Sequence, residues 1–293
     1  MFVPDGFLPL TLLLLCLFAF LAGFIDAMVG GGGLIQLPAL LLLLPDVPVP
    51  TVLGTGKVAS LAGTSAALRR YLSGSGAVPL RWRTVAVTAL VAGGFALLGA
   101  RAVSGLHKEA VRPLVLVLLV LMAAYTFWRK DFGSLHAPRL HGRREVLTGV
   151  ALGASVGFYD GFFGPGTGSL LLFAFVGLFG YDFIAASASA KLVNVATNIT
   201  GLAYFVYTGQ VLYQVALPMA VCNVLGSTLG AQMALKRGTG FVRVLFLVMV
   251  SAFILKLGWE TVRPQPLAAA PRPAVQTLLP AVRTSVDGPR SRP

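Results

Sequence analysis

Eight long apolar segments constrain this chain more than any other feature of its sequence. They cover residues 7–28, 53–72, 82–102, 110–128, 145–163, 186–208, 213–235 and 241–259. A helix needs roughly 20 apolar residues to cross a bilayer, and each segment is about that long. Only 11% of the 293 residues are charged, whereas soluble domains carry about 25%. The sequence therefore predicts an all-α polytopic integral membrane protein and excludes a water-soluble globular fold.

Two shorter apolar segments, 33–45 and 167–180, each follow a cluster of glycines. Glycine allows the backbone to break, and a broken backbone at membrane depth is tolerated only where it is buried in protein or lines a cavity. We therefore expect one glycine-broken helix in each half of the chain and eight to ten helical segments in total.

The second half of the chain repeats the first. GFIDAMVGGGG begins at Gly23, and GFYDGFFGPGTG begins 134 residues later at Gly157. GKVAS at 56–60 corresponds to AKLVN at 190–194 with the same separation. Internal repeats whose helices are interrupted at corresponding points are typical of secondary transporters.

The repeat divides the chain into four parts. We expect a first transmembrane repeat over 1–128, a basic linker loop over 129–144, a second transmembrane repeat over 145–260 and a disordered tail, rich in proline and arginine, over 261–293. The linker and the tail each carry a net charge of +4 and together hold most of the total of +13. Topology and lipid headgroups explain charge in such places, so nucleic acid is not expected as a partner.

Each repeat has four or five crossings, and the number decides how the halves are related. Five crossings would make the repeats inverted, and four would make them parallel. The loop at 73–81 is flanked by arginines while its counterpart near Gly209 has none, which favours inversion under the positive-inside rule. The loops near Lys108 and Arg237 are both basic, which inversion does not predict. We favour the inverted arrangement.

Four ionisable residues lie inside the apolar segments in a matched pattern. Asp26 and Lys57 are 31 residues apart in the first half, and Asp160 and Lys191 are 31 residues apart in the second. An ionisable residue in hydrocarbon costs about 2.5–3.5 kcal/mol on insertion scales. Two interpretations stay open: one Asp–Lys bridge in each half that only holds helices together, or a substrate and coupling site between the halves.

The chemistry around these residues favours an anion. A helix that starts after a glycine break points its free N–H groups and positive dipole end into the gap, and each half adds a lysine. Asp26 and Asp160 then make better sense as proton carriers, or as partners that hold the lysines until the substrate arrives. The candidate substrate-binding residues are Lys57, Lys191, Asn194, Asn198, Ser60, Thr64, Gly31, Gly32, Gly33, Gly164, Gly166, Thr167 and Gly168.

Enzyme motifs fail when they are checked against the sequence. TGK at 55–57 is followed by Val58, where a phosphate-binding loop needs Ser or Thr. The histidines lie in charged connecting segments, and no nucleophile–base pair falls within the spans. We therefore expect no enzymatic activity, no cofactor and no metal.

The glycine-rich and lysine-bearing segments resemble the TauE/SafE family of sulfite exporters, also called DUF81-type transporters. The segments that carry the resemblance are 23–41, 54–68, 157–173 and 190–202. The resemblance implies a multi-pass protein of the bacterial inner membrane that exports sulfite, organosulfonates or related organic acids. The expected partners are a small anion, protons and the bilayer, and a homodimer is left open. The alternatives are an anion channel and a structural membrane subunit that transports nothing.

Overall fold

The structure is a computed structural model that describes residues 9–73, 80–103 and 137–262, with side chains as far as Arg237. Every regular element within these ranges is an α-helix, which confirms the predicted class. The helices are α1 (Pro9–Val29), α2 (Gly33–Leu43), α3 (Val49–Ser73), α4 (Trp82–Val103), α6 (Gly142–Phe162), α7 (Thr167–Gly177), α8 (Phe183–Tyr207) and α9 (Tyr213–Val262). The predicted span 110–128, the first half of the linker (129–136) and nearly all of the tail lie outside the described residues.

Helices that the 134-residue correspondence relates have equal lengths. α1 and α6 have 21 residues each, α2 and α7 have 11, and α3 and α8 have 25. Equal lengths in this order are what a duplicated unit predicts.

Both predicted helix breaks are present, and they contact each other. Gly30 has a φ of +83° and Gly164 a φ of +88°, a left-handed conformation that favours glycine. The N–H of Ser169 donates to the carbonyl of Gly30 at 2.9 Å. A Cβ on Gly30 would overlap the backbone of Gly168. The broken ends of the two halves therefore meet at one place in the middle of the fold.

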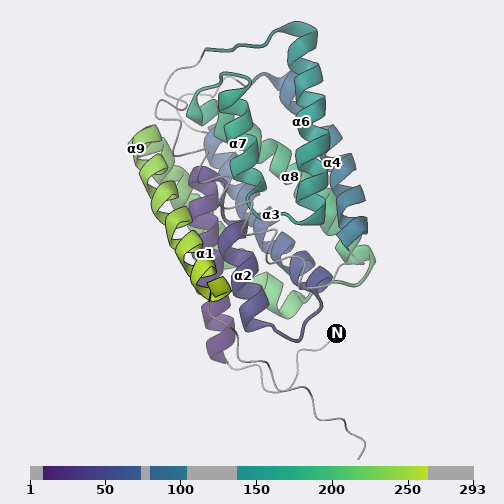
Figure 1. The fold of residues 1–293 in the computed structure, drawn as a ribbon, viewed down its shortest axis with the longest axis vertical. Helices are drawn as coiled ribbons and strands as arrows, with labels where there is room; N and C mark the ends of the chain where they lie inside the picture. The colour runs from purple at the N-terminus through teal and green to yellow at the C-terminus, as the bar shows by residue number, and fades with distance from the viewer. Residues whose placement is uncertain (1–8, 74–79, 104–136, 263–293) are drawn as a thin grey trace, which may run out of the picture.

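The helices of the two halves are interleaved. α4 lies along α6 on one flank of the molecule, and α1 lies along α9 on the other (Figure 1). Gly149 packs on Thr88 and Gly161 packs on Ala96, so α4 and α6 run parallel. Bare glycine backbones allow such close approach where lipid provides no hydrophobic force between helices. Each of these contacts joins the first half to the second.

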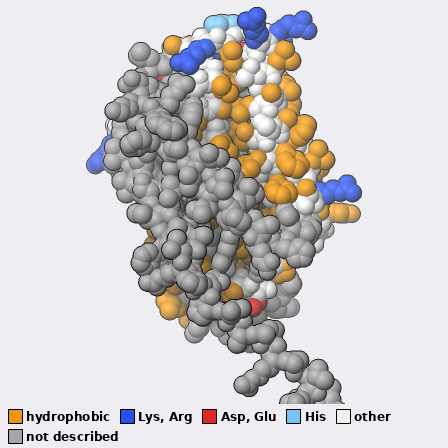
Figure 2. Space-filling view, in the orientation of Figure 1, with side chains coloured by type: hydrophobic (Ala, Val, Ile, Leu, Met, Phe, Trp, Pro, Cys, Tyr) orange, Lys and Arg blue, Asp and Glu red, His pale blue; other side chains and the backbone are white. Residues whose placement is uncertain are grey.

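The exposed surface of the helices is apolar. α1, α4 and the Tyr213–Arg237 part of α9 are long and apolar enough to cross a membrane. On the face shown in Figure 2, hydrophobic side chains cover much of the described surface, and Lys and Arg side chains gather mainly towards its upper end. Exposed leucines such as Leu90, Leu98 and Leu147 stand on α4 and α6. Lipid-facing helices present a surface of this kind.

A polar cluster holds the starts of α4 and α6 together. The Glu145 carboxylate is buried, and it accepts hydrogen bonds at 2.8 Å from both the Arg81 guanidinium and the Tyr181 hydroxyl. Tyr181 lies in the loop between α7 and α8. Burial raises the pKa of the Tyr181 phenol above its usual range, and the Glu145 carboxylate beside it raises that pKa further. The phenol therefore stays protonated and remains a donor to Glu145.

The extents of α9 and α6 differ from those of the predicted segments. The sequence predicts separate spans at 213–235 and 241–259 with a basic loop between them, but the backbone is helical throughout α9. The glycines at 238 and 240 weaken a helix by about 1 kcal/mol each without forcing it to end, so composition alone is a poor guide here. α6 begins at Gly142, three residues before the expected start of the second repeat.

Candidate functional site

A small cavity lies where the two helix breaks meet. Its volume is about 60 Å³, which is room for a few water molecules or one small oxyanion. Twelve of the predicted site residues line it: Asp26, Gly33, Lys57, Ser60, Thr64, Asp160, Gly164, Gly166, Thr167, Gly168, Asn194 and Asn198. Lys191, Gly31 and Gly32 are not among the lining residues. Leu37, Leu40, Val52, Leu53 and Phe163 complete the wall with apolar side chains.

One ion pair joins Lys57 on α3 to Asp160 on α6. The Lys57 ammonium donates to a carboxylate oxygen of Asp160 at 2.8 Å and to the side-chain oxygen of Asn198 at 3.2 Å. The Asn198 amide donates in turn to the Asn194 side-chain oxygen at 3.2 Å. The side chains of Lys57 and Asp160 are only 9% and 3% exposed. This pair is short, nearly dry and part of the cavity wall.

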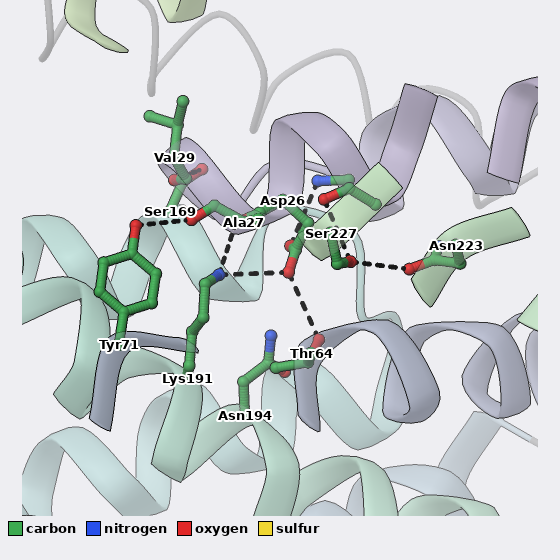
Figure 3. Close-up of polar contacts among 12 residues, drawn as sticks. Asp26, Ala27, Val29, Thr64, Tyr71, Ser169, Lys191, Asn194, Asn223 and Ser227 are labelled. Carbon is green, nitrogen blue, oxygen red and sulfur yellow. Dashed lines mark hydrogen bonds and ion pairs between the residues drawn. The ribbon is translucent and has the colours of Figure 1, made fainter. Parts of the chain in front are cut away.

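The second ion pair joins Lys191 on α8 to Asp26 on α1 (Figure 3). The Lys191 ammonium lies 3.3 Å from the carboxylate and donates to the Asp26 backbone carbonyl at 2.5 Å. The Thr64 hydroxyl and the Gly32 N–H also donate to the Asp26 carboxylate, at 3.3 and 3.4 Å. The Asp26 side chain is 15% exposed. Its carboxylate is therefore held by several longer bonds and faces the cavity.

The structure corrects the pairing that the sequence suggests. Equal spacing pairs Asp26 with Lys57 and Asp160 with Lys191, but each aspartate bonds the lysine of the other half. The reason is that α3 and α8 run antiparallel across the middle of the fold. Lys57 lies beside Gly201 near the end of α8, whereas Lys191, nearer its start, shares Asp26 with Thr64. Each lysine thus reaches the broken helix of the opposite half.

The expected free N–H groups at the helix breaks are partly occupied. The N–H of Gly32 donates to Asp26, that of Thr167 to the Gly164 carbonyl at 3.2 Å, and that of Ser169 to Gly30. The formal charges of the two lysines and the two aspartates cancel, so the site is neutral overall. An anion can therefore enter only if it replaces a carboxylate on a lysine or if a carboxylate takes up a proton.

Sequence reasoning missed a chain of polar side chains behind the cavity. The Asn223 amide on α9 donates to the Gln36 oxygen at 3.0 Å, and the Gln36 amide donates to the Gly56 carbonyl at 2.8 Å. Ser227 donates to the side-chain oxygen of Asn223 at 3.2 Å. Gln36 lines the cavity beside Lys57. The repeat hid these residues, because the positions that correspond to them are occupied by Leu170, Ala92 and Ala96.

Comparisons with known proteins agree with this architecture. The family model described as "Sulfite exporter TauE/SafE" matches residues 15–257. A Haemophilus influenzae protein named "Probable membrane transporter protein" is 32% identical over 256 residues, which are 87% of this chain and 97% of that protein.

Two further relatives carry similar names. "Probable membrane transporter protein ORF9" of Sinorhizobium sp is 32% identical over 82% of this chain and 89% of its own length. "Probable membrane transporter protein YfcA" of Escherichia coli K12 is 31% identical over 86% of this chain and 91% of its own length. No matching solved structure was found. The relatives support a membrane transporter, and the chain belongs to the TauE/SafE sulfite exporter family.

Proposed function

We propose that this protein is a secondary transporter that exports small anions such as sulfite, organosulfonates or related organic acids. Transport is by alternating access at the cavity between the two repeats, in the bacterial inner membrane, and it is coupled to protons through Asp26 and Asp160. The observation that carries the proposal is the pair of buried Asp–Lys bridges, each joining one repeat to the other at a single cavity.

Alternating access requires the two halves to move against each other about a site that neither half completes alone. Both bridges and the Ser169–Gly30 hydrogen bond cross from one half to the other, so relative motion of the halves changes all of them. The antiparallel course of α3 and α8 supports the inverted arrangement of the repeats. Inverted repeats allow one protein to adopt outward-facing and inward-facing forms of similar energy.

The buried charges favour a functional site over a purely structural role. Replacing a buried ion pair with well-packed apolar residues is often neutral or stabilising. Two such pairs are therefore poorly explained by a contribution to protein stability alone. Ionisable residues within membrane segments mark substrate pathways and proton relays. A neutral pair that can release its lysine to an anion and its aspartate to a proton provides both.

The test is flux in proteoliposomes that contain the purified protein. Sulfite, methanesulfonate and acetate are each supplied with and without an imposed pH gradient. We expect saturable uptake of at least one anion that responds to the gradient, and loss of that response with Asp160→Asn. Flux that does not saturate and a measurable conductance would instead establish a channel. The absence of flux with every anion would leave a structural membrane subunit.

A further inference from the structure

We propose that the two repeat-related lysines do different work, and that the anion binds on Lys57 alone. The ligand is a small oxyanion with a single negative charge, and Asp160 takes up one proton when it binds. Lys191 does not bind the anion: it bonds Asp26 when the anion enters and positions the end of α1. This inference rests on the proposed function and narrows it, because Asp160 is the aspartate that takes up a proton on binding.

Lys57 is the lysine that lines the cavity. Its ammonium already faces two cavity-lining side chains, Asp160 and Asn198. A ligand that replaces Asp160 would therefore find the ammonium in place and the Asn194–Asn198 amides beside it. The Lys57 stem lies against the bare backbone of Gly201, where a Cβ would stand 3.0 Å from its Cε. This groove holds the lysine extended towards the cavity.

Lys191 is tied to backbone behind the cavity wall. Its ammonium donates to the Asp26 carbonyl at 2.5 Å, and its side chain is 4% exposed (Figure 3). That carbonyl belongs to the last turn of α1 and also accepts from the Gly30 N–H at 2.8 Å, and a cation at this end of a helix is favoured by the helix dipole. Ala67 stands at the position that corresponds to Gly201, so no equivalent groove leads this lysine into the cavity. Lys191 is thus a positioning residue.

The proton follows from the burial of Asp160. When the ligand accepts the N–H bond of Lys57, the Lys57–Asp160 bond breaks and leaves a carboxylate that is 3% exposed. An unpaired buried carboxylate is strongly unfavourable. Asp160 therefore gains a proton from water and forms a neutral carboxylic acid, while Lys57 keeps its charge. The site is neutral before binding and neutral afterwards.

Few groups near Asp160 compete for this proton. Among the described residues, the titratable groups that face it are Lys57 on α3, the phenol of Tyr159 on its own helix and, on the same cavity, the Asp26 carboxylate of α1, which Lys191 holds. α4 faces this part of α6 with Ala92 and Ala96. The nearby cavity-lining side chains from α7 and α8 are Thr167, Asn194 and Asn198, which carry no charge.

Asp26 limits the ligand to one negative charge. Its carboxylate lines the cavity, and Lys191, Thr64 and the Gly32 N–H all donate to it. A second negative charge on the ligand would face this carboxylate across a cavity of about 60 Å³. The structure therefore favours a small singly charged ion over a doubly charged one of equal size.

The experiment measures anion binding to the purified protein by calorimetry. The probes are sulfite, methanesulfonate and the doubly charged sulfate. Methanesulfonate keeps one charge over the working pH range, so any protons taken up on binding go to the protein, and buffers of different ionisation heat count them. Lys57→Gln/Asp160→Asn removes the working pair without leaving a lone buried charge. Lys191→Gln is the matched change at the related lysine: Asp26, which is 15% exposed, keeps its bonds from Thr64 and the Gly32 N–H, so its carboxylate is not left alone as that of Asp160 would be.

We expect Lys57→Gln/Asp160→Asn to lose about ten-fold or more in affinity, because a hydrogen bond to a charged group is lost. Lys191→Gln should bind within about three-fold of the wild type and still take up one proton per methanesulfonate. Sulfate should bind more weakly than the singly charged methanesulfonate. Equal losses in both variants, or no proton uptake, would overturn the inference while leaving an anion transporter. If the wild type binds none of the probes, the proposed function fails as well.

Discussion

Gly201→Ala tests whether the position of the Lys57 ammonium sets anion affinity. A Cβ at residue 201 would lie 3.0 Å from Cε and 3.2 Å from Cδ of Lys57. Ordinary carbon–carbon contact is about 3.5–4.0 Å, so the lysine must move by about 0.5 Å. Moving a unit charge that far from a partner at 2.8 Å changes the Coulomb energy by about 1 kcal/mol at an effective dielectric constant of about 20. The Asp160 side chain can follow the ammonium, whereas an anion held by Asn194 and Asn198 cannot, so the anion bears this loss and we expect its dissociation constant to rise about five-fold.

Protein stability should not fall in parallel. Alanine is favoured over glycine within a helix by about 1 kcal/mol, and the crowded atoms belong to a flexible side chain. The assay is binding of methanesulfonate and sulfite by calorimetry, together with thermal unfolding in detergent. Gly94→Ala is the control, because a Cβ on that helical glycine would meet nothing within 4 Å. Wild-type affinity in Gly201→Ala, with the control also unchanged, would refute the role given to the lysine's position.

Two further predictions concern the frame that holds the site. Gly161→Ala places a Cβ on the Ala96 carbonyl, and the overpacking should lower stability by about 1–3 kcal/mol; an unchanged unfolding temperature in detergent would contradict the packing of α4 on α6. Glu145→Gln replaces the carboxylate that accepts from Arg81 and Tyr181. It should lower the free energy of unfolding by about 1–3 kcal/mol. The control Arg143→Gln, at an exposed residue, should change the free energy of unfolding by less than about 0.5 kcal/mol in the same thermal measurement. Equal losses in the two variants would show that the Glu145 cluster makes no particular contribution to stability.

Local signals in the sequence predict the broken helices closely. The apolar segments 33–45 and 167–180 correspond to α2 and α7, which begin at Gly33 and Thr167. They are predictable because a backbone with a positive φ favours glycine at one position. That glycine can be read from the sequence without knowing what packs around it. The span 82–102 likewise corresponds to α4, since an apolar run of crossing length needs no tertiary information.

Boundaries that depend on more than hydrophobicity are predicted less well. α3 begins at Val49 and not at residue 53, because Pro50 fits the first turn of a helix although it ends an apolar run. The start of α8 is set by Asp182, whose carboxylate accepts from the N–H groups of Ile184 and Ala185 at 2.8 and 2.9 Å. Such a cap is visible in the sequence, but the search for apolar spans passes over it.

The identities of the four buried charges are readable from the sequence, but their partners are not. A duplication repeats every separation along the chain, so Asp26–Lys57 and Asp160–Lys191 look like natural pairs. Only the antiparallel crossing of α3 and α8 decides that each lysine reaches the opposite half. Since each bridge takes one residue from each half, neither repeat forms a bridge alone, and motion of one repeat against the other must change the cavity between them. The cross-pairing is therefore what makes a carrier a better explanation of these charges than a fixed scaffold.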